Sequence, residues 1–215
     1  MITKEMKIEE VVKQNPDAID ILSECQIDFC CGGKQVLNNA AKEAGQDPDE
    51  LVARIASYRR PGKADDWRQV LDFNREELIN YIVVKHHRQE ELLIEEVERL
   101  LAKILYVHYR SHQDSLAPIY RTFLELKGEL TPHFAQEEKI DFPAALAGDP
   151  IDWSGLKDDH EQVGGLLKKL QELSSDFTPP DDACTTYRRA FEKLHELVDD
   201  IHLHVFLENS VLFEK

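Results

Sequence analysis

Two segments of the sequence carry a histidine followed four residues later by a glutamate. These pairs are His133 with Glu137 and His204 with Glu208. Residues four apart lie on one face of an α-helix, so each pair can offer an imidazole and a carboxylate in the same direction. This combination of ligands suits iron, manganese or zinc. The spacing therefore predicts metal binding.

Two single histidines, His86 and His160, occupy comparable places on two further segments with helical periodicity. A ligand must point into a helical bundle, so the residues three, four and seven positions away should be apolar. His86 and His160 meet this condition, whereas the neighbours of His87 are mixed, and His86 is therefore the preferred ligand. Four helices with four inward histidines and two inward glutamates match a carboxylate-bridged dinuclear metal site.

The remaining histidines are expected at the surface or behind the ligands: His87, His108, His112, His195 and His202. Glu138 is rotated by about 100° from Glu137 and is expected to point outward or to lie behind the ligands. In a metal-free alternative, the inward histidines would be ordinary hydrogen-bonded core residues. That alternative would leave two buried carboxylates with no aligned lysine or arginine, which is costly.

A dinuclear site with these ligands would keep open coordination positions. Two glutamates bridging two metals, each capped by two histidines, leave room for a further ligand on each metal. Such a site can do chemistry or bind a small molecule, whereas a saturated site only stabilises the fold. The residues do not distinguish iron from manganese.

The second candidate site is the turn Cys30-Cys31-Gly32-Gly33, which is followed by Lys34. The two glycines are expected to adopt positive φ and to leave the sulfurs uncovered. Lys34 and a helix start after Gly33 are expected to lower the pKa of both thiols. Cys30 and Cys31 are thus the candidate catalytic residues for metal transfer, nitrosylation or redox chemistry. Alternatively, they are two small buried apolar side chains.

The composition restricts the partners. A net charge of −16 over 215 residues argues against a nucleic acid held by its phosphates and against an anionic membrane surface. No segment approaches the roughly 20 apolar residues needed to span a bilayer, and the start lacks the apolar run of a secretory signal. We therefore expect a cytoplasmic protein whose four cysteines are thiols. Cys25 is expected to be buried, and Cys184 is assigned no role.

The periodicity predicts an all-α chain in two parts. Residues 1–58 are expected to form a small helical domain, 59–66 a linker, and 67–215 an antiparallel four-helix bundle. The bundle helices are expected from Asn74 past Leu101, from Asp114 to Lys139, from Trp153 to Ser174 and from Pro180 to Asn209. Pro132 is expected to kink or restart the second of these helices.

Several stretches together resemble the bacterial family of iron–sulfur cluster repair di-iron proteins, which have a hemerythrin-like bundle. They are Ile27 to Gln35 around the double cysteine, Asp66-Trp67-Arg68, His133 to Glu138, Pro179 to Thr186, and His204 to Phe213. The resemblance covers nearly the whole chain. It implies two non-haem iron ions bridged by two glutamates and an oxo group, in a cytoplasmic stress protein. By position it implies the ligands His86, His133, Glu137, His160, His204 and Glu208.

The resemblance also implies a function, the repair of iron–sulfur clusters damaged by nitric oxide or oxidative stress through donation of labile iron. Classical hemerythrins have a second histidine where this chain has Gly164, which fits a more labile metal pair. The alternatives are catalytic reduction of nitric oxide, and reversible binding of oxygen or nitric oxide by a carrier or sensor. The expected partners are damaged iron–sulfur proteins and nitric oxide or oxygen, and a homodimer is left open.

Overall fold

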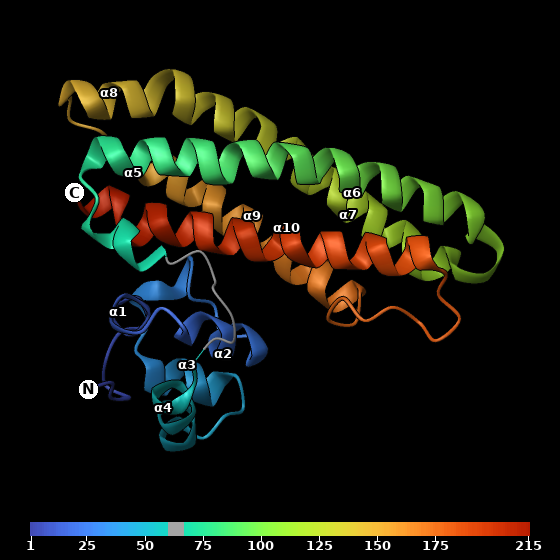
Figure 1. Ribbon diagram of the computed structural model, residues 1–215, viewed down its shortest axis with the longest axis horizontal. Coiled ribbons are helices and arrows are strands. Elements are labelled where there is room, and N and C mark those ends of the chain that lie inside the picture. The colour runs from blue at the N-terminus through green and yellow to red at the C-terminus, as the bar shows by residue number, and fades with distance from the viewer. Residues whose placement is uncertain (60–66) are drawn as a thin grey trace. The chain divides into compact units, whose positions relative to one another are not determined.

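The computed structural model describes residues 1–59 and 67–215, and within these ranges the chain is helical without a β-strand (Figure 1). The predicted all-α class is confirmed. The predicted linker 59–66 falls, apart from Arg59, outside the described residues. Contacts divide the chain into two compact units, Met1–Leu78 with Val205–Lys215, and Ile79–His204. The predicted domain bounds differ from this division and stay a prediction.

The first unit contains four short α-helices, as predicted. They are α1 (Ile8–Gln14), α2 (Ala18–Glu24), α3 (Leu37–Glu43) and α4 (Pro48–Ser57), with the 3-10 turns η1 (Gly32–Lys34), η2 (Trp67–Asp72) and, near the C-terminus, η5 (Leu212–Glu214). Helix α4 begins where Asp47 accepts hydrogen bonds from the backbone N–H groups of Asp49 and Glu50. Each helix is too short to be stable alone, so buried apolar residues hold them together. These include Ile8, Val11, Val12, Leu22, Leu37, Leu51 and Ile55.

The second unit is built on four long helical stretches that run alongside one another in Figure 1. The first joins α5 (Arg75–Tyr81), the π-helix η3 (Ile82–His87) and α6 (Arg88–Val107). The second joins α7 (Tyr109–Gln136), the π-helix η4 (Glu137–Asp141) and α8 (Phe142–Ala147). The third and fourth are α9 (Ser154–Leu173) and α10 (Thr185–Ser210). The part of α5 up to Leu78 and the part of α10 from Val205 onward belong to the first unit.

Local signals in the sequence set several of these helix ends. Asn74 and Glu77 form a capping box, in which each backbone N–H donates to the side chain of the other, at 2.9 and 3.0 Å. Helix α8 ends at Gly148, whose φ of 81° lies in the left-handed region that glycine adopts without strain. These features place the starts and stops of helices close to where the sequence predicts them.

The restart expected at Pro132 is not found, and the backbone there stays helical. Helix α7 continues through Pro118 and Pro132, and its non-helical residue is His112, with φ −133° and ψ 19°. The Thr131 hydroxyl donates to the carbonyl of Lys127 at 2.9 Å, as in a helix interior, and caps no new helix. Proline removes one donor from the helix, and the remaining hydrogen bonds keep it continuous here.

The two π-helical segments change the register of the helices that carry them. Ile82–His87 and Glu137–Asp141 close their hydrogen bonds over five residues instead of four. Each π turn adds a residue relative to the 3.6-residue period, so the side chains on either side of it are rotated against one another. A periodicity counted along the sequence does not include this rotation.

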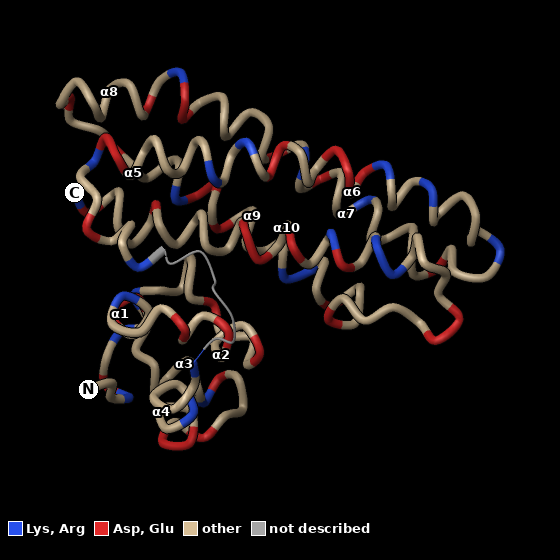
Figure 2. Tube along the Cα trace, viewed as in Figure 1, with Lys and Arg blue, Asp and Glu red and all other residues tan. Residues whose placement is uncertain are grey.

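The long helices are amphipathic, with an apolar core and a charged exterior. Acidic and basic residues are interspersed along their length in Figure 2. Fully buried side chains in this unit include Ile82, Leu101, Phe123, Phe142, Leu167 and Tyr187. None of the helices in the described ranges combines the length and apolar character that crossing a bilayer requires.

Candidate metal centre

Two groups of buried histidines and glutamates lie next to each other in the interior. In each group, one ligand atom per residue lies within 4.8 Å of all the others. The groups are His87, Glu137, His204, Glu208 and His133, Glu137, His160, Glu208. Glu208 follows His204 by one turn on the continuous helix α10. The two groups share Glu137 and Glu208, as expected if both carboxylates bridge two metal ions.

The imidazoles face each other in two pairs. Nε2 of His87 lies 3.2 Å from Nε2 of His204, and Nε2 of His133 lies 3.2 Å from Nε2 of His160. Oε2 of Glu137 lies 3.3 Å from Nε2 of His87 and 3.4 Å from Nε2 of His133. Glu137 thus contacts one histidine of each pair. With metal–ligand bonds of about 2.1 Å, neighbouring ligands of one metal are separated by about 3 Å, so the spacing suits one ion per pair.

Carboxylates hold the opposite nitrogen of three of these rings. The pairs are His87 Nδ1 with Glu138 at 2.9 Å, His204 Nδ1 with Glu90 at 3.0 Å, and His133 Nδ1 with Asp159 at 3.4 Å. A carboxylate at Nδ1 fixes the proton there and leaves the lone pair on Nε2. The lone pairs of His87 and His204 then face each other, which is unfavourable unless a cation lies between them.

Burial adds to the case for a cation. The side chains of His87, Glu137 and Glu208 are fully buried, and His204 is 1% exposed. Burying carboxylates and imidazoles in an apolar bundle is costly, and metal coordination removes much of this cost. Nitrogen and oxygen donors in this proportion fit non-haem iron, so the residues present suit a dinuclear iron centre.

The structure differs from the sequence prediction at the first histidine. His87 lies in the first group, whereas His86 lies outside both groups and contacts Asp200, with Nδ1 3.1 Å from Oδ2. The π-helix Ile82–His87 is the physical reason, because its extra residue turns His87 toward Glu137 and His204. Because the sequence neighbours of His87 are partly polar, the sequence pattern did not indicate that His87 points into the bundle. The other five predicted ligands lie within the two groups: His133, His160, His204, Glu137 and Glu208.

Glu138 and the other histidines lie outside the two ligand groups. Glu138 lies behind His87, and its second oxygen accepts a hydrogen bond from Arg88. His108 contacts Cys184, His112 pairs with Asp182, and His195 stacks on Phe177. Neither ligand group contains His108, His112, His195 or His202.

The cysteine turn forms a separate group of potential ligands within the first unit. Sγ of Cys30 lies 3.7 Å from Sγ of Cys31 and 3.2 Å from Oδ1 of Asp28. The same Asp28 oxygen accepts the backbone N–H groups of both cysteines at 2.9 Å. Asn209 donates to the carbonyl of Cys30 at 3.2 Å, and Phe206 packs against Phe29. All four cysteines of the chain are free thiols.

The expectation of lowered thiol pKa values is wrong for Cys30. Its hydrogen bond with Cys31, its burial and the nearby Asp28 carboxylate raise the pKa of Cys30 well above its usual value. Lys34 does not act on the thiols as a free positive charge, because its ammonium pairs with Glu9 at 2.9 Å and with Glu214.

The two glycines of the turn are needed for space rather than for positive φ. Gly45 and Gly148 are the positive-φ glycines of the described chain, and neither lies in this turn. A Cβ on Gly32 would lie 3.2 Å from Cγ of Asp28, and a Cβ on Gly33 would lie 3.3 Å from Cβ of Glu9. The glycines therefore let Asp28 and Glu9 approach the backbone closely. Cys25 is buried, as expected.

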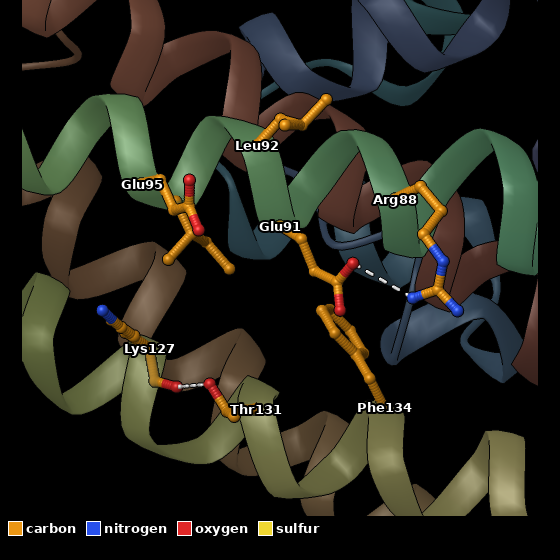
Figure 3. A pocket seen from close by; sticks show the side chains of 8 residues that line it. Arg88, Glu91, Leu92, Glu95, Lys127, Thr131 and Phe134 are labelled. Atoms are coloured by element: carbon orange, nitrogen blue, oxygen red, sulfur yellow. Dashed lines mark hydrogen bonds and ion pairs between the residues drawn. The ribbon is translucent and has the colours of Figure 1, made fainter.

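A surface hollow of about 530 Å³ lies between α6 and α7 (Figure 3). It is lined by Arg88, Glu91, Leu92, Ile94, Glu95, Lys127, Thr131 and Phe134. The Phe134 ring stacks on His87 with centroids 4.5 Å apart. The hollow is thus separated from the metal ligands by one aromatic ring, and none of those ligands lines it.

Two family models and several named relatives match this chain. The family model described as a hemerythrin HHE cation binding domain matches residues 78–215, and the ScdA_N model, a domain of unknown function, matches 4–59. The chain is 34% identical to the iron-sulfur cluster repair protein ScdA of Staphylococcus haemolyticus, over 100% of this chain and 99% of that protein. It is 33% identical to the iron-sulfur cluster repair protein YtfE of Dickeya chrysanthemi, over 99% and 96% of the two chains. With YtfE of Escherichia coli O1:K1 the identity is 30%, over 100% and 98%.

Proposed function

This chain belongs to the family of hemerythrin-like iron–sulfur cluster repair proteins, and on that premise we propose that it repairs damaged clusters by supplying iron. The damage in question is that caused by nitric oxide or oxidative stress. The iron would come from a dinuclear non-haem centre in the bundle. Proteins that carry damaged iron–sulfur clusters would be its partners.

The proposed ligands are His87, His133, Glu137, His160, His204 and Glu208. His87 replaces His86, which was the ligand predicted from the sequence. Two iron ions bound here, with an oxo group as a further bridge, would supply transferable metal and open positions for a small ligand such as nitric oxide. The observation that carries this proposal is the pairing of imidazoles with Nε2 atoms 3.2 Å apart.

The side chains around the proposed site favour metal that is bound but can dissociate. Glu138, Glu90 and Asp159 contact Nδ1 of His87, His204 and His133, and this leaves the Nε2 lone pairs available to hold metal. The residues that would hold each ion are two histidines together with Glu137 and Glu208, fewer donors than a saturated site has. Gly164 on α9 provides no additional imidazole one turn after His160. This small ligand number fits a donor of iron better than a permanent store.

The cysteine turn is proposed to assist by binding metal or nitric oxide. With Asp28, the thiols of Cys30 and Cys31 form a group of three potential ligands. Because the pKa of Cys30 is raised, this thiol must lose its proton on binding, which a metal ion promotes. The turn would therefore act when a cation arrives and would be a poor nucleophile on its own.

The proposal is tested by following iron-57 in the protein before and after a damaged or apo iron–sulfur acceptor is added. We expect Mössbauer spectra of two antiferromagnetically coupled irons per chain that diminish as the acceptor regains its cluster. The control is an equal amount of ferrous salt, which should restore the acceptor less well. Absence of the coupled pair, or iron that stays in the protein while the acceptor remains damaged, would overturn the proposal.

A further inference from the structure

We propose that His86, Glu90 and Asp200 form a third metal-binding site, which takes a single divalent cation such as Fe²⁺ or Mn²⁺ beside the dinuclear centre. Its role, to bind iron transiently as iron enters or leaves the dinuclear centre, rests on the proposed function. The existence of the site does not depend on that function. All three residues lie outside the six ligands assigned above.

The three residues come together from two helical stretches of the second unit. His86 in η3 and Glu90 in α6 are four residues apart, and Asp200 lies on α10 one turn before His204. One ligand atom from each residue lies within 4.8 Å of the other two. Nδ1 of His86 is 3.1 Å from Oδ2 of Asp200. Neighbouring ligands of one metal lie at about this separation.

Two buried atoms of this cluster have no hydrogen-bond partner among the residues that the structure describes. They are Nε2 of His86 and Oε2 of Glu90, and both residues are fully buried. Oε1 of Glu90 is already engaged by Nδ1 of His204. A buried polar atom without a partner is destabilising, and for an ionised carboxylate the cost is larger. A cation held by Nδ1 of His86, Asp200 and Glu90 would satisfy the free Glu90 oxygen.

No lysine or arginine pairs with Glu90 or Asp200 within the described ranges, so their charge is balanced by imidazoles alone. One imidazole and two carboxylates form an oxygen-rich donor set, which suits Fe²⁺ and Mn²⁺. Three protein donors leave several positions for water, so the bound ion should exchange readily.

The cluster connects the dinuclear centre with solvent. Glu90 contacts the proposed ligand His204, and the rings of His86 and His204 stack with centroids 5.6 Å apart. Asp200, by contrast, is partly exposed, with 20% of its side chain accessible. An ion at this site would therefore be adjacent to the pair on one side and accessible to water on the other.

The test measures Mn²⁺ binding by electron paramagnetic resonance in the full-length protein with its iron pair already loaded and oxidised. The coupled pair is silent in this experiment, and bound Mn²⁺ reduces the signal of free Mn²⁺. We expect the wild-type protein to bind one additional Mn²⁺ per chain. His86→Phe and Asp200→Asn should each weaken this binding by about tenfold or more while the iron pair remains.

Asp199→Asn is the matched control, because it removes the same charge from the neighbouring exposed position, where Asp199 faces His195. It should leave Mn²⁺ binding unchanged.

Equal weakening by Asp199→Asn would show diffuse attraction to an acidic surface and would overturn the inference. Failure of the loaded wild-type protein to bind additional Mn²⁺ would also overturn it, as would loss of the iron pair itself in His86→Phe. Absence of the coupled iron pair from the wild-type protein, measured before Mn²⁺ is added, would instead overturn the proposed function.

Discussion

The histidine centre and the cysteine turn both place a carboxylate beside a potential metal ligand, but with opposite consequences. In the bundle, Glu138 accepts a hydrogen bond from Nδ1 of His87, which leaves the Nε2 lone pair ready for a metal. In the turn, Asp28 contacts the thiol of Cys30, and its negative charge helps to keep that thiol protonated. An imidazole is ready to bind metal when neutral, whereas a thiol must first become an anion. A neighbouring carboxylate therefore favours metal binding by an imidazole and opposes metal binding by a thiol.

The largest effect should come from removing a ligand of the histidine centre. His87→Ala should abolish the coupled iron pair, because His87 supplies one of the two imidazoles of its ion. His86→Ala should retain two irons per chain. Metal analysis and Mössbauer spectroscopy would measure both, with circular dichroism to confirm that each variant is folded. Retention of the pair in His87→Ala together with its loss in His86→Ala would restore the original assignment from the sequence.

A smaller effect is expected when the carboxylate behind His87 is neutralised. Glu138→Gln should lower iron affinity by about 10- to 100-fold, because the partner that orients His87 is weakened. Competition with an iron chelator would measure this affinity. Glu91→Gln is a suitable control, since Glu91 also pairs with Arg88 but, among the residues that the structure describes, forms no hydrogen bond with a proposed ligand. Equal losses in the two variants would show that the charge, and not its contact with His87, matters.

In the cysteine turn, the expected change is in reactivity and not in metal content. The hydrogen bond with Cys31 is the largest cause of the raised pKa of Cys30, followed by burial. Cys31→Ala should therefore lower the pKa of Cys30 and speed its alkylation at pH 8, about tenfold for each unit of pKa. Mass spectrometry of the labelled peptide would follow the rate, with Cys184→Ala as control. Rapid alkylation of Cys30 in the wild-type protein would contradict the comparison.

The smallest effect concerns Glu214, which pairs with Lys13 and Lys34. Burial raises the pKa of Glu214, but the hydrogen bonds from Lys34 and Lys13 outweigh it and leave the pKa below its usual 4.5. A lowered folded-state pKa contributes stability that is present above pH 4.5 and is lost as the pH falls through the folded value. Because Glu214 is partly exposed, the contribution should be at most about 1 kcal/mol.

Denaturation of the metal-free protein at pH 7 and pH 3.5 would measure this contribution. The free energy of unfolding of the Glu214→Gln variant should be slightly lower than that of the wild type at pH 7. The difference between the two should be smaller at pH 3.5. A difference that grows as the pH falls would have the wrong sign.

The parts of the structure that depend on local rules were predictable from the sequence. Asp47 and the Asn74–Glu77 capping box mark helix starts, and the four-residue spacing of His204 and Glu208 places both on one face of a regular α-helix. His160 also follows the apolar period of α9. Local hydrogen bonds and regular geometry determine these features, so nearby residues are sufficient to reveal them.

Other features depend on tertiary contacts that no local pattern reports. A π turn formed at Ile82–His87 exchanges His87 for His86 in the ligand group. Glu90 lies in a charged stretch of the sequence, and only the approach of α10 makes it a buried partner of His204. The raised pKa of Cys30 likewise depends on how Asp28 and Cys31 are packed around the sulfur.

The π-helix at Ile82–His87 also bears on how such a site can evolve. A π turn is what a single-residue insertion leaves in an α-helix when the residues on both sides keep their contacts. At this position, the insertion or loss of one codon would decide which of two adjacent histidines joins the metal ligands, without any change in His133, His160 or His204. The identity of a ligand can thus change through chain length alone, and the displaced histidine is left free to acquire a different role.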